Sequence, residues 1–285
     1  MRLLELTDLV RRRDPAGHRL PVEVEAVVER LRASGQHRAA RIARRLPARG
    51  GVLDDEAIDR LLVRVHCELQ RLAEELQQGR RVAEQLAGWV DELRRADPGR
   101  SVRVVDVGCG IGYTLRWLAA HRALGKGVEL VGVDLDRTLV SAAAERAARE
   151  GLDVRFLVGD AFDPGRAVTD PGHTIVISSG LLHHLPAEDL PAFFGRHGEL
   201  GVFAFCHWDP VPGAWSTAGA WVFHRARMRE PVSRHDGVLS VRRAHRAATL
   251  LAAARPALPG YEVSCVEGWP PALTQVLRPV IGVRR

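Results

Sequence analysis

Three glycines at alternate positions follow an aspartate in the segment VVDVGCGIGYT, residues 104–114. Glycine lets the backbone turn sharply and approach a ligand closely, because it has no side chain. The spacing is G-x-G-x-G, with Tyr113 at the position where a dinucleotide-binding fingerprint has its third glycine, and no Gly-Lys-Ser/Thr follows as in a phosphate-binding loop. The carboxylate of Asp106 suits a cationic ligand group better than a pyrophosphate.

Two further segments carry side chains that could do acid–base chemistry. His183 and His184 occur in LLHHLP, and His207 and Asp209 occur in FCHWDP, each after or at the end of an apolar run. Histidine is the usual base near neutral pH. The His-x-Asp pair would place both side chains on one face of a continuing strand, although Pro210 limits that continuation. Two possible ligands do not make a metal site, and we predict none.

Short apolar runs alternate with helical segments after Gly99, which predicts buried parallel strands in a doubly wound α/β fold. The expected strands are 102–107, 128–135, 153–160, 173–179 and 201–208. Segments 261–269 and 275–285 are expected to add two strands, antiparallel because their connection is short. Ligands of such sheets bind beyond the carboxyl ends of the strands, which is where the glycine loop falls.

The first 99 residues are predicted to be helical and to contain no strand. An apolar stripe of helical spacing starts at Ile58, after the acidic Asp54-Asp55, and a second stripe from Val82 to Leu93 continues it. We therefore expect a helical cap or lid at 1–99 and a ligand-binding domain at 100–285.

An insertion in the second domain is expected at about 208–240. It contains three of the six tryptophans, Trp208, Trp215 and Trp221. Long insertions beside a site are often binding loops, and tryptophans there suggest a flat, apolar substrate. The alternative is that these tryptophans anchor the insertion on the core.

Composition narrows the class of protein. The net charge of +6 could indicate a nucleic-acid partner, but the arginines are spread along the chain beside glutamates, which favours solvated helix faces. The four cysteines form no C-x-x-C pair, so neither a zinc site nor a disulfide framework is indicated. No apolar run reaches the roughly 18 residues of a membrane span, and the N-terminal segment lacks the order of a signal peptide. We expect a cytoplasmic protein.

Four segments in order resemble the motifs of class I S-adenosylmethionine-dependent methyltransferases. They are the glycine loop, VGVDLD at 131–136, VGDAFD at 158–163 and ISSGLLHHLP at 177–186. The resemblance covers about residues 100–285. It implies a seven-stranded, mostly parallel, Rossmann-like sheet with an antiparallel C-terminal strand, and S-adenosylmethionine as the cofactor.

The resemblance also implies which residues contact the cofactor. Asp106 and the backbone of the loop would face the cationic methionine part, the loop residues being Gly108, Cys109, Gly110 and Gly112. Asp134 would accept hydrogen bonds from the ribose hydroxyls, and Ile111 and Leu135 would pack on the adenosine.

The adenine would lie beside the next strand end. Asp160 would accept a hydrogen bond from the adenine amino group, and Ala161 would offer its backbone amide to the ring. Ser178, near the end of the fourth strand, is a further predicted cofactor contact.

Methyl transfer is a direct displacement on an activated sulfonium, so the protein must align the acceptor and deprotonate it where it is a hydroxyl. The carboxyl end of the fifth strand makes His207 a candidate base with Asp209 beside it, and a positional role for His207 stays open. We favour packing and capping for His183 and His184, with His184 retained as an alternative base.

The sequence thus predicts a methyltransferase that acts on an oxygen of an apolar, aromatic or polyketide-like small molecule, and a homodimer is left open. Alternatives are C- or N-methylation of a small molecule, an RNA methyltransferase, or a regulatory protein that binds the cofactor without turnover. Amino-directed base methyltransferases carry [DN]-P-P-[YF] where this chain has SSGLL, which counts against a nucleic-acid acceptor.

Overall fold

The structure is a computed structural model that describes residues 3–13, 19–266 and 276–285. The chain forms two compact units. The smaller unit comprises Met1–Leu69 and Pro212–Arg243, and the larger comprises Gln70–Val211 and Ala244–Arg285. Of the predicted C-terminal strand segments, residues 267–269 and Gln275 lie outside the described residues. The cap or lid role of residues 1–99 stays a prediction.

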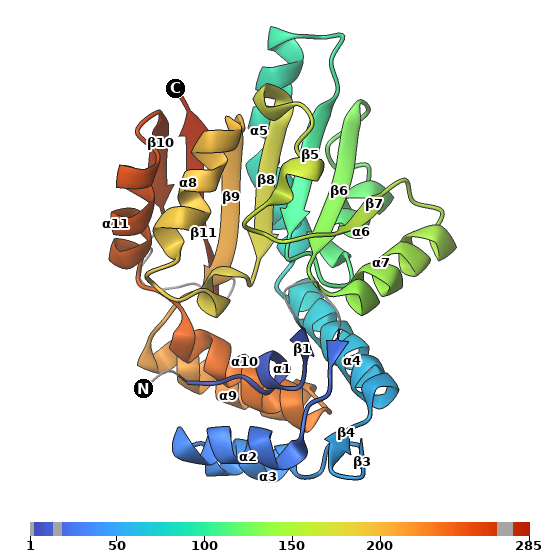
Figure 1. Ribbon diagram of the computed structural model, residues 1–285. Helices are drawn as coiled ribbons and strands as arrows, with labels where there is room; N and C mark the ends of the chain where they lie inside the picture. The colour runs from blue at the N-terminus through green and yellow to red at the C-terminus, as the bar shows by residue number, and fades with distance from the viewer. Residues whose placement is uncertain (1–2, 14–18, 267–275) are drawn as a thin grey trace. The chain divides into compact units, whose positions relative to one another are not determined.

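A seven-stranded sheet forms the centre of the larger unit, in the order β10-β11-β9-β8-β5-β6-β7 (Figure 1). The strands are β5 Val102–Val107, β6 Val128–Asp134, β7 Arg155–Val158, β8 Thr174–Ser179, β9 Ala204–Pro210, β10 Tyr261–Cys265 and β11 Leu277–Arg284. Neighbours among β5 to β9 pair in parallel, whereas β11 is antiparallel to both β9 and β10. The predicted fold class is confirmed.

Helices cover both faces of this sheet. Successive strand residues point to opposite sides, and the strands carry apolar side chains on both sides that must be buried. Val104, Ile175 and Cys206 pack with apolar residues of α5 and α6 in one core cluster. Val176 and Phe205 pack with residues of α8 and α11 in another. The helices of this unit are α5 Gln78–Ala96, α6 Tyr113–Ala120, α7 Arg137–Arg149, α8 Leu190–Leu200 and α11 Ala247–Ala257, with 3-10 turns η1 Pro164–Arg166, η2 Pro171–His173 and η3 Leu182–His184.

The smaller unit is mainly helical, as predicted for the N-terminal region. Its elements are α1 Leu6–Leu9, β1 Arg12–Arg13, β2 Arg19–Leu20, α2 Val24–Ala33, α3 His37–Ala43, β3 Ala48–Arg49, β4 Val52–Leu53, α9 Ala214–Arg227 and α10 Pro231–Arg243. Helix α4, Asp55–Glu75, begins in this unit and ends in the other. Gln77 then takes a left-handed conformation, with φ +54°, so the predicted continuous stripe is divided between α4 and α5.

The two short antiparallel ladders β1–β2 and β3–β4 show that the prediction of no strand in the first 99 residues was wrong. Each strand has two residues, too few to show the alternation that reveals a strand. Gly50 and Gly51 join β3 to β4, both with positive φ. Gly-Gly between two strands is a recognised hairpin signal, and it was the available clue.

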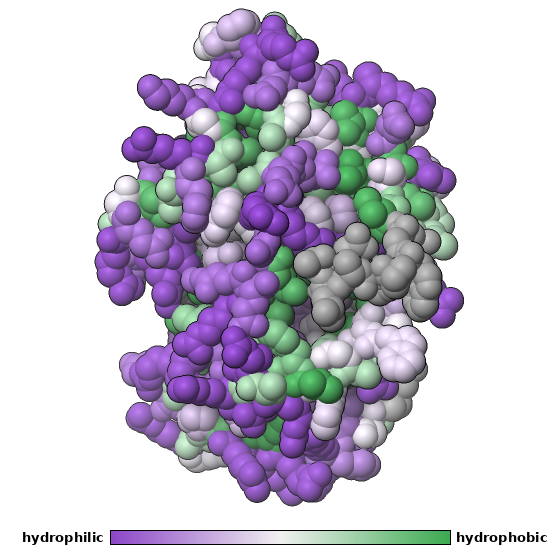
Figure 2. Space-filling model, turned by 180° about the vertical axis from the view of Figure 1, so that it is seen from behind, coloured by the Kyte–Doolittle hydropathy of each residue, from purple (hydrophilic) through white to green (hydrophobic). Residues whose placement is uncertain are grey.

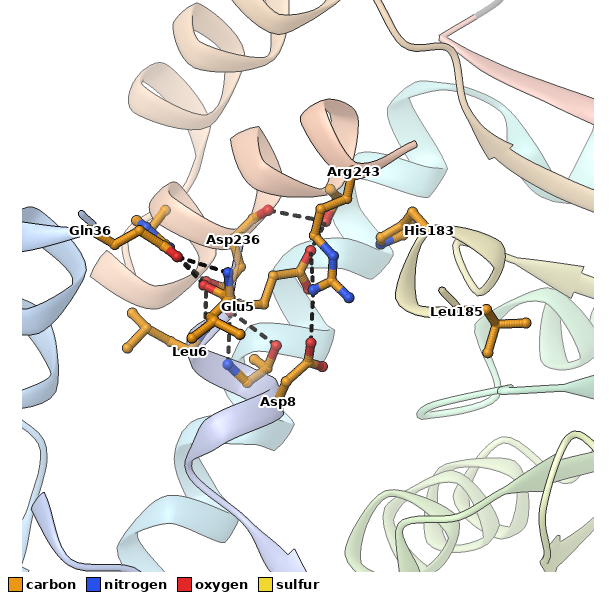
Figure 3. Close-up of polar contacts among 12 residues, drawn as sticks. Glu5, Leu6, Asp8, Gln36, His183, Leu185, Asp236 and Arg243 are labelled. Carbon is orange, nitrogen blue, oxygen red and sulfur yellow. Dashed lines mark hydrogen bonds and ion pairs between the residues drawn. The ribbon is translucent and has the colours of Figure 1, made fainter. Parts of the chain in front are cut away.

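Asp236 on α10 ties the N-terminal segment to the rest of the smaller unit. Its carboxylate accepts hydrogen bonds from the backbone amides of Leu6 at 3.0 Å and Thr7 at 2.9 Å, at the start of α1. Arg243, further along α10, forms an ion pair with Asp8 at 2.7 Å, and Figure 3 shows these groups together. A carboxylate at a helix N-terminus satisfies amides that have no partner within the helix.

The molecular surface seen in Figure 2 is mainly hydrophilic, with hydrophobic residues in separate patches. Among the helices of the described ranges, none combines the length and the hydropathy that crossing a membrane requires.

We predict that Asp236→Ala lowers the free energy of unfolding by about 1–3 kcal/mol, because it leaves the buried amide of Leu6 and the partly buried amide of Thr7 without an acceptor. Asp8→Ala is the matched control. It removes a partly exposed ion pair from the same segment and should cost less than about 1 kcal/mol. Denaturant unfolding of both variants measures the difference, and equal losses would contradict the capping role of Asp236.

Candidate functional site

The glycine loop after β5 has three left-handed residues in five. Gly108, Gly110 and Gly112 have φ values of +70°, +54° and +71°. This conformation is costly for residues with a side chain, which explains why glycine occurs at every second position. The amides of Gly108 and Cys109 both donate to the carbonyl of Val133 at 2.8 and 3.1 Å. The loop is therefore held against the end of β6.

Neighbouring side chains leave no room for a Cβ atom at Gly112 and little room at Gly108. A Cβ atom on Gly112 would lie 2.4 Å from the ring of Phe156, and one on Gly108 would lie 3.1 Å from Leu181. Gly112 also precedes α6 as its N-cap residue. Leu181 belongs to the connection between β8 and η3, so this connection lies beside the loop.

Asp134, the last residue of β6, holds the loop through its side chain. One carboxylate oxygen accepts a hydrogen bond from the amide of Gly110 at 2.8 Å, and the other accepts from the amide of Asp136 at 2.8 Å. The next residue, Leu135, is 62% exposed and offers an apolar surface at the same strand end.

Asp160 follows the adjacent strand β7. Asp134 pairs with Val158, and Asp160 is two residues beyond that pair. Its carboxylate accepts from the amide of Phe162 at 2.9 Å, and Ala161 is half-buried. The structure thus brings the glycine loop, Asp134 and Asp160 to the neighbouring carboxyl ends of β5, β6 and β7, as the sequence predicts.

Asp106 is the most buried acidic group of this region, with 3% of its surface exposed. Burial, and secondarily the nearby charge of Asp134, raises the pKa of the Asp106 carboxyl to about 8. A cationic ligand group beside it would favour the ionised form. The electrostatics of this strand end therefore suit a ligand that brings positive charge.

His207 lies fully inside the larger unit and not at a surface. Its Nδ1 is 2.9 Å from the hydroxyl of Ser178, and its Nε2 is 3.1 Å from Nε2 of His197. Nδ1 of His197 in turn lies 2.9 Å from the carbonyl of Phe193. Only one proton arrangement satisfies all three bonds of two neutral rings: His197 donates to Phe193, His207 donates to His197, and Ser178 donates to His207.

Burial also keeps these imidazoles neutral. It lowers the pKa of His197 to about 4 and that of His207 well below the ordinary value. Ser178 is fully buried as well, and its hydroxyl is used within the network. This geometry favours the positional role of His207 over the base role, and it offers no exposed surface of Ser178 to a cofactor.

His183 and Asp209 form a different pair at the carboxyl ends of β8 and β9. Nδ1 of His183 is 2.9 Å from one carboxylate oxygen of Asp209, and both side chains are almost fully buried. The other oxygen of Asp209 has no hydrogen-bond partner among the described residues. The His184 ring is stacked at a tilt on His183, with 4.3 Å between centroids.

The pair has the arrangement of an oriented base. An Nδ1–H that donates to a carboxylate leaves Nε2 as the basic nitrogen. The sequence predicts a packing role for His183, and its pairing with Asp209 is found only in the structure. The available signal was that Asp209 ends one predicted strand while His183 follows the strand before it along the chain.

The three tryptophans of the predicted insertion do not form one binding loop. Trp208 is buried in β9, where the guanidinium of Arg81 lies 4.7 Å above its ring. Trp215 and Trp221 belong to the helix α9 of the smaller unit, and Trp215 is 82% exposed. Segment 208–221 is therefore a strand end followed by a helix, and Trp215 does not anchor the insertion on the core.

We predict that Gly112→Ala is more destabilising than Gly151→Ala, which serves as its matched control. Gly151 has a similar φ of +66° but open space around its Cβ position. Left-handed strain alone should cost about 1–2 kcal/mol, and the overlap with Phe156 should add about 1–3 kcal/mol at position 112. Denaturant unfolding gives both values, and equal losses would mean that Phe156 yields without cost.

Comparison with known proteins extends these findings. Residues 104–199 match a family described as a methyltransferase domain. Ribosomal RNA small subunit methyltransferase C of Alcanivorax borkumensis is 41% identical over 78 residues, which are 26% of this chain and 22% of that protein. Nocamycin O-methyltransferase of Saccharothrix syringae is 38% identical over 109 residues, which are 38% of this chain and 37% of that protein. The matches thus span less than two-fifths of these curated relatives.

A solved structure of magnesium protoporphyrin IX methyltransferase from Synechocystis PCC 6803 with bound SAH is 16% identical. The likeness has a TM-score of 0.48 and covers 92% of this chain and 99% of that one. The order of the seven strands, the glycine loop that Asp134 holds, and the match over residues 104–199 identify in this chain a methyltransferase domain of the class I S-adenosylmethionine-dependent family.

Proposed function

We propose that the protein transfers the methyl group of S-adenosylmethionine to an oxygen of an apolar, aromatic or polyketide-like small molecule. The observation that best supports methyl transfer is the glycine loop at the carboxyl ends of β5 and β6. Asp134 holds this loop in place, and the buried Asp106 precedes it. The likeness to nocamycin O-methyltransferase supports an oxygen acceptor. When bound, the cofactor supplies a methyl group on an activated sulfonium.

The residues at the strand ends fit the parts of this cofactor. Asp106 would lie near the cationic methionine part, where its charge is favourable. Asp134 would accept hydrogen bonds from ribose hydroxyls in addition to the Gly110 amide. The exposed side chain of Leu135 would pack on the adenosine, and Asp160 would accept from the adenine amino group.

His183 is the base in this proposal, in place of His207. Asp209 accepts the hydrogen bond from Nδ1 of His183, which sets the tautomer and the direction of the ring. Nε2 of His183 would then take the proton of an acceptor hydroxyl. Leu181 brings the connection that carries His183 against the glycine loop, and His184 remains the alternative base.

An RNA acceptor is the second candidate. The positive charge of the protein is concentrated in the smaller unit, whose sequence has 20 arginines against 13 acidic residues, while the larger unit has 21 basic and 22 acidic residues. The likeness to ribosomal RNA small subunit methyltransferase C points the same way. The SSGLL segment at 178–182 stands against amino-directed methylation of a base.

The test is production of S-adenosylhomocysteine in the presence of phenolic or enolic acceptors and, separately, of RNA. We expect turnover with the small molecules. Turnover with RNA alone, and binding that weakens steeply with salt, would favour the second candidate. Cofactor binding without turnover on any acceptor would favour a regulatory role.

We predict that His183→Gln and Asp209→Asn each lower the turnover of a hydroxyl acceptor by about 10²–10⁴-fold, the usual contribution of a positioned base. The affinity for the cofactor should change little, because neither side chain is assigned to it. His184→Gln is the control and should retain most activity. Near-normal turnover in both His183→Gln and Asp209→Asn would mean that the protein catalyses the reaction by aligning the substrates alone. An inactive but folded His184→Gln protein would indicate that His184 is the base.

We also predict that cofactor affinity rises between about pH 6 and 7.5. Asp106 is mostly protonated in this range because its pKa is about 8 without ligand, and the cationic cofactor favours its ionised form. Binding should therefore release a proton, with up to about a tenfold gain in affinity per pH unit. Calorimetry measures this release, and the Asp106→Asn variant should lose it.

The same carboxyl links stability of the ligand-free protein to pH. Its pKa is raised from the ordinary value of 3.8 to about 8 in the folded protein. The contribution of Asp106 to the free energy of unfolding is therefore fully present below about pH 4, and it is lost as the pH rises through about 8.

The predicted coupling between cofactor binding and the ionisation of Asp106 would be excluded if the native protein bound the cofactor with an affinity independent of pH.

A further inference from the structure

Gln78, the first residue of α5, carries a buried polar atom without a partner among the described residues. Only 1% of the residue is exposed. Its amide nitrogen donates to the hydroxyl of Ser179 at 3.3 Å, whereas its amide oxygen has no hydrogen-bond partner in this part of the chain. Proteins rarely leave a buried acceptor unsatisfied, because its desolvation is then uncompensated. The oxygen is therefore suited to a donor supplied by a ligand.

The hydrogen bond to Ser179 places the side-chain amide of Gln78 beside the end of β8, the strand next to the one that leads into the glycine loop. Ser179 is the last residue of β8. Asp106 pairs with Ile177, and two residues further along each strand are Gly108 and Ser179. The helix N-terminus that carries Gln78 thus lies on the β5–β8 side of the loop, away from the strands β6 and β7.

A tight contact fixes the start of α5 in this position. The backbone of Gly79 lies close to the hydroxyl of Tyr113, the first residue of α6 after the loop. A Cβ atom on Gly79 would lie 2.3 Å from the ring of Trp117, so glycine is required for α5 to approach α6 this closely. Gln78 cannot shift far without disturbing both contacts.

We propose that the amide oxygen of Gln78 accepts a hydrogen bond from the ammonium group of S-adenosylmethionine. The inference rests on the proposed function. The cofactor has three kinds of donor: the ribose hydroxyls, the adenine amino group and the ammonium. The first two are assigned to Asp134 and Asp160 at the ends of β6 and β7. The ammonium is the donor that belongs on the β5–β8 side, near the carboxylate of Asp106.

The proposal predicts a selective loss. Gln78→Met keeps the size of the side chain but removes its polar atoms. It should weaken the binding of S-adenosylhomocysteine by about tenfold, on the scale of one hydrogen bond to a charged group. The affinity for 5′-methylthioadenosine, which lacks the amino-acid part, should be unchanged. Isothermal calorimetry measures both, and thermal unfolding verifies that the variant is folded.

Two further variants make the result unambiguous. Gln78→Glu should bind S-adenosylhomocysteine at least as well as the native protein, because a carboxylate also accepts from an ammonium. Stronger weakening by Glu than by Met would instead indicate that Gln78 faces the carboxylate of the ligand, and would overturn the proposal. Asp160→Ala is the control for the shared nucleoside part, because its carboxylate is assigned to the adenine amino group and does not hold the glycine loop, and it should weaken both ligands alike.

The remaining outcomes separate the two levels of inference. If Gln78→Met leaves both affinities unchanged, or lowers both equally, the assignment of Gln78 is wrong while the proposed function stands. If the native protein binds neither ligand, both the assignment and the proposed cofactor are wrong.

Discussion

The hydrogen bond between the Asp134 carboxylate and the Gly110 amide is the constraint on which the candidate site depends. It joins the end of β6 to a loop that leaves β5, and the carbonyl of Val133 adds two bonds from the same strand end. The loop then has one conformation, which only glycine adopts easily at three positions. That conformation determines where α6 begins and brings Leu181, and with it the η3 turn, alongside the loop.

Much of the larger unit could be predicted because its signals are local. Buried parallel strands appear in the sequence as apolar runs between helices, and carboxylates at the ends of β6 and β7 fall at one edge of the sheet once the strands are parallel. The G-x-G-x-G spacing reflects positive φ at Gly108, Gly110 and Gly112, a backbone property that the identity of each residue indicates.

Other features depended on contacts between distant residues. Strand alternation correctly placed His207 and Asp209 on one face, but it could not show that the two have different environments. Ser178 and His197 enclose His207 in the core, whereas His183 from η3 meets Asp209 at the strand end. The cost of desolvating an imidazole, which lowers the pKa of His207, arises from this packing and has no counterpart in the local sequence.

The interleaved order of the two units has a consequence for biosynthesis. The amide of Leu6 and its acceptor on Asp236 are separated by 230 positions in the chain, and at about 5–20 residues per second the ribosome needs roughly 10–50 seconds to supply the second after the first. During this interval the whole parallel sheet from β5 to β9 is synthesised. The start of α1 therefore lacks the Asp236 carboxylate that caps it while most of the other unit is synthesised. A chaperone would bind the nascent chain with this segment uncapped.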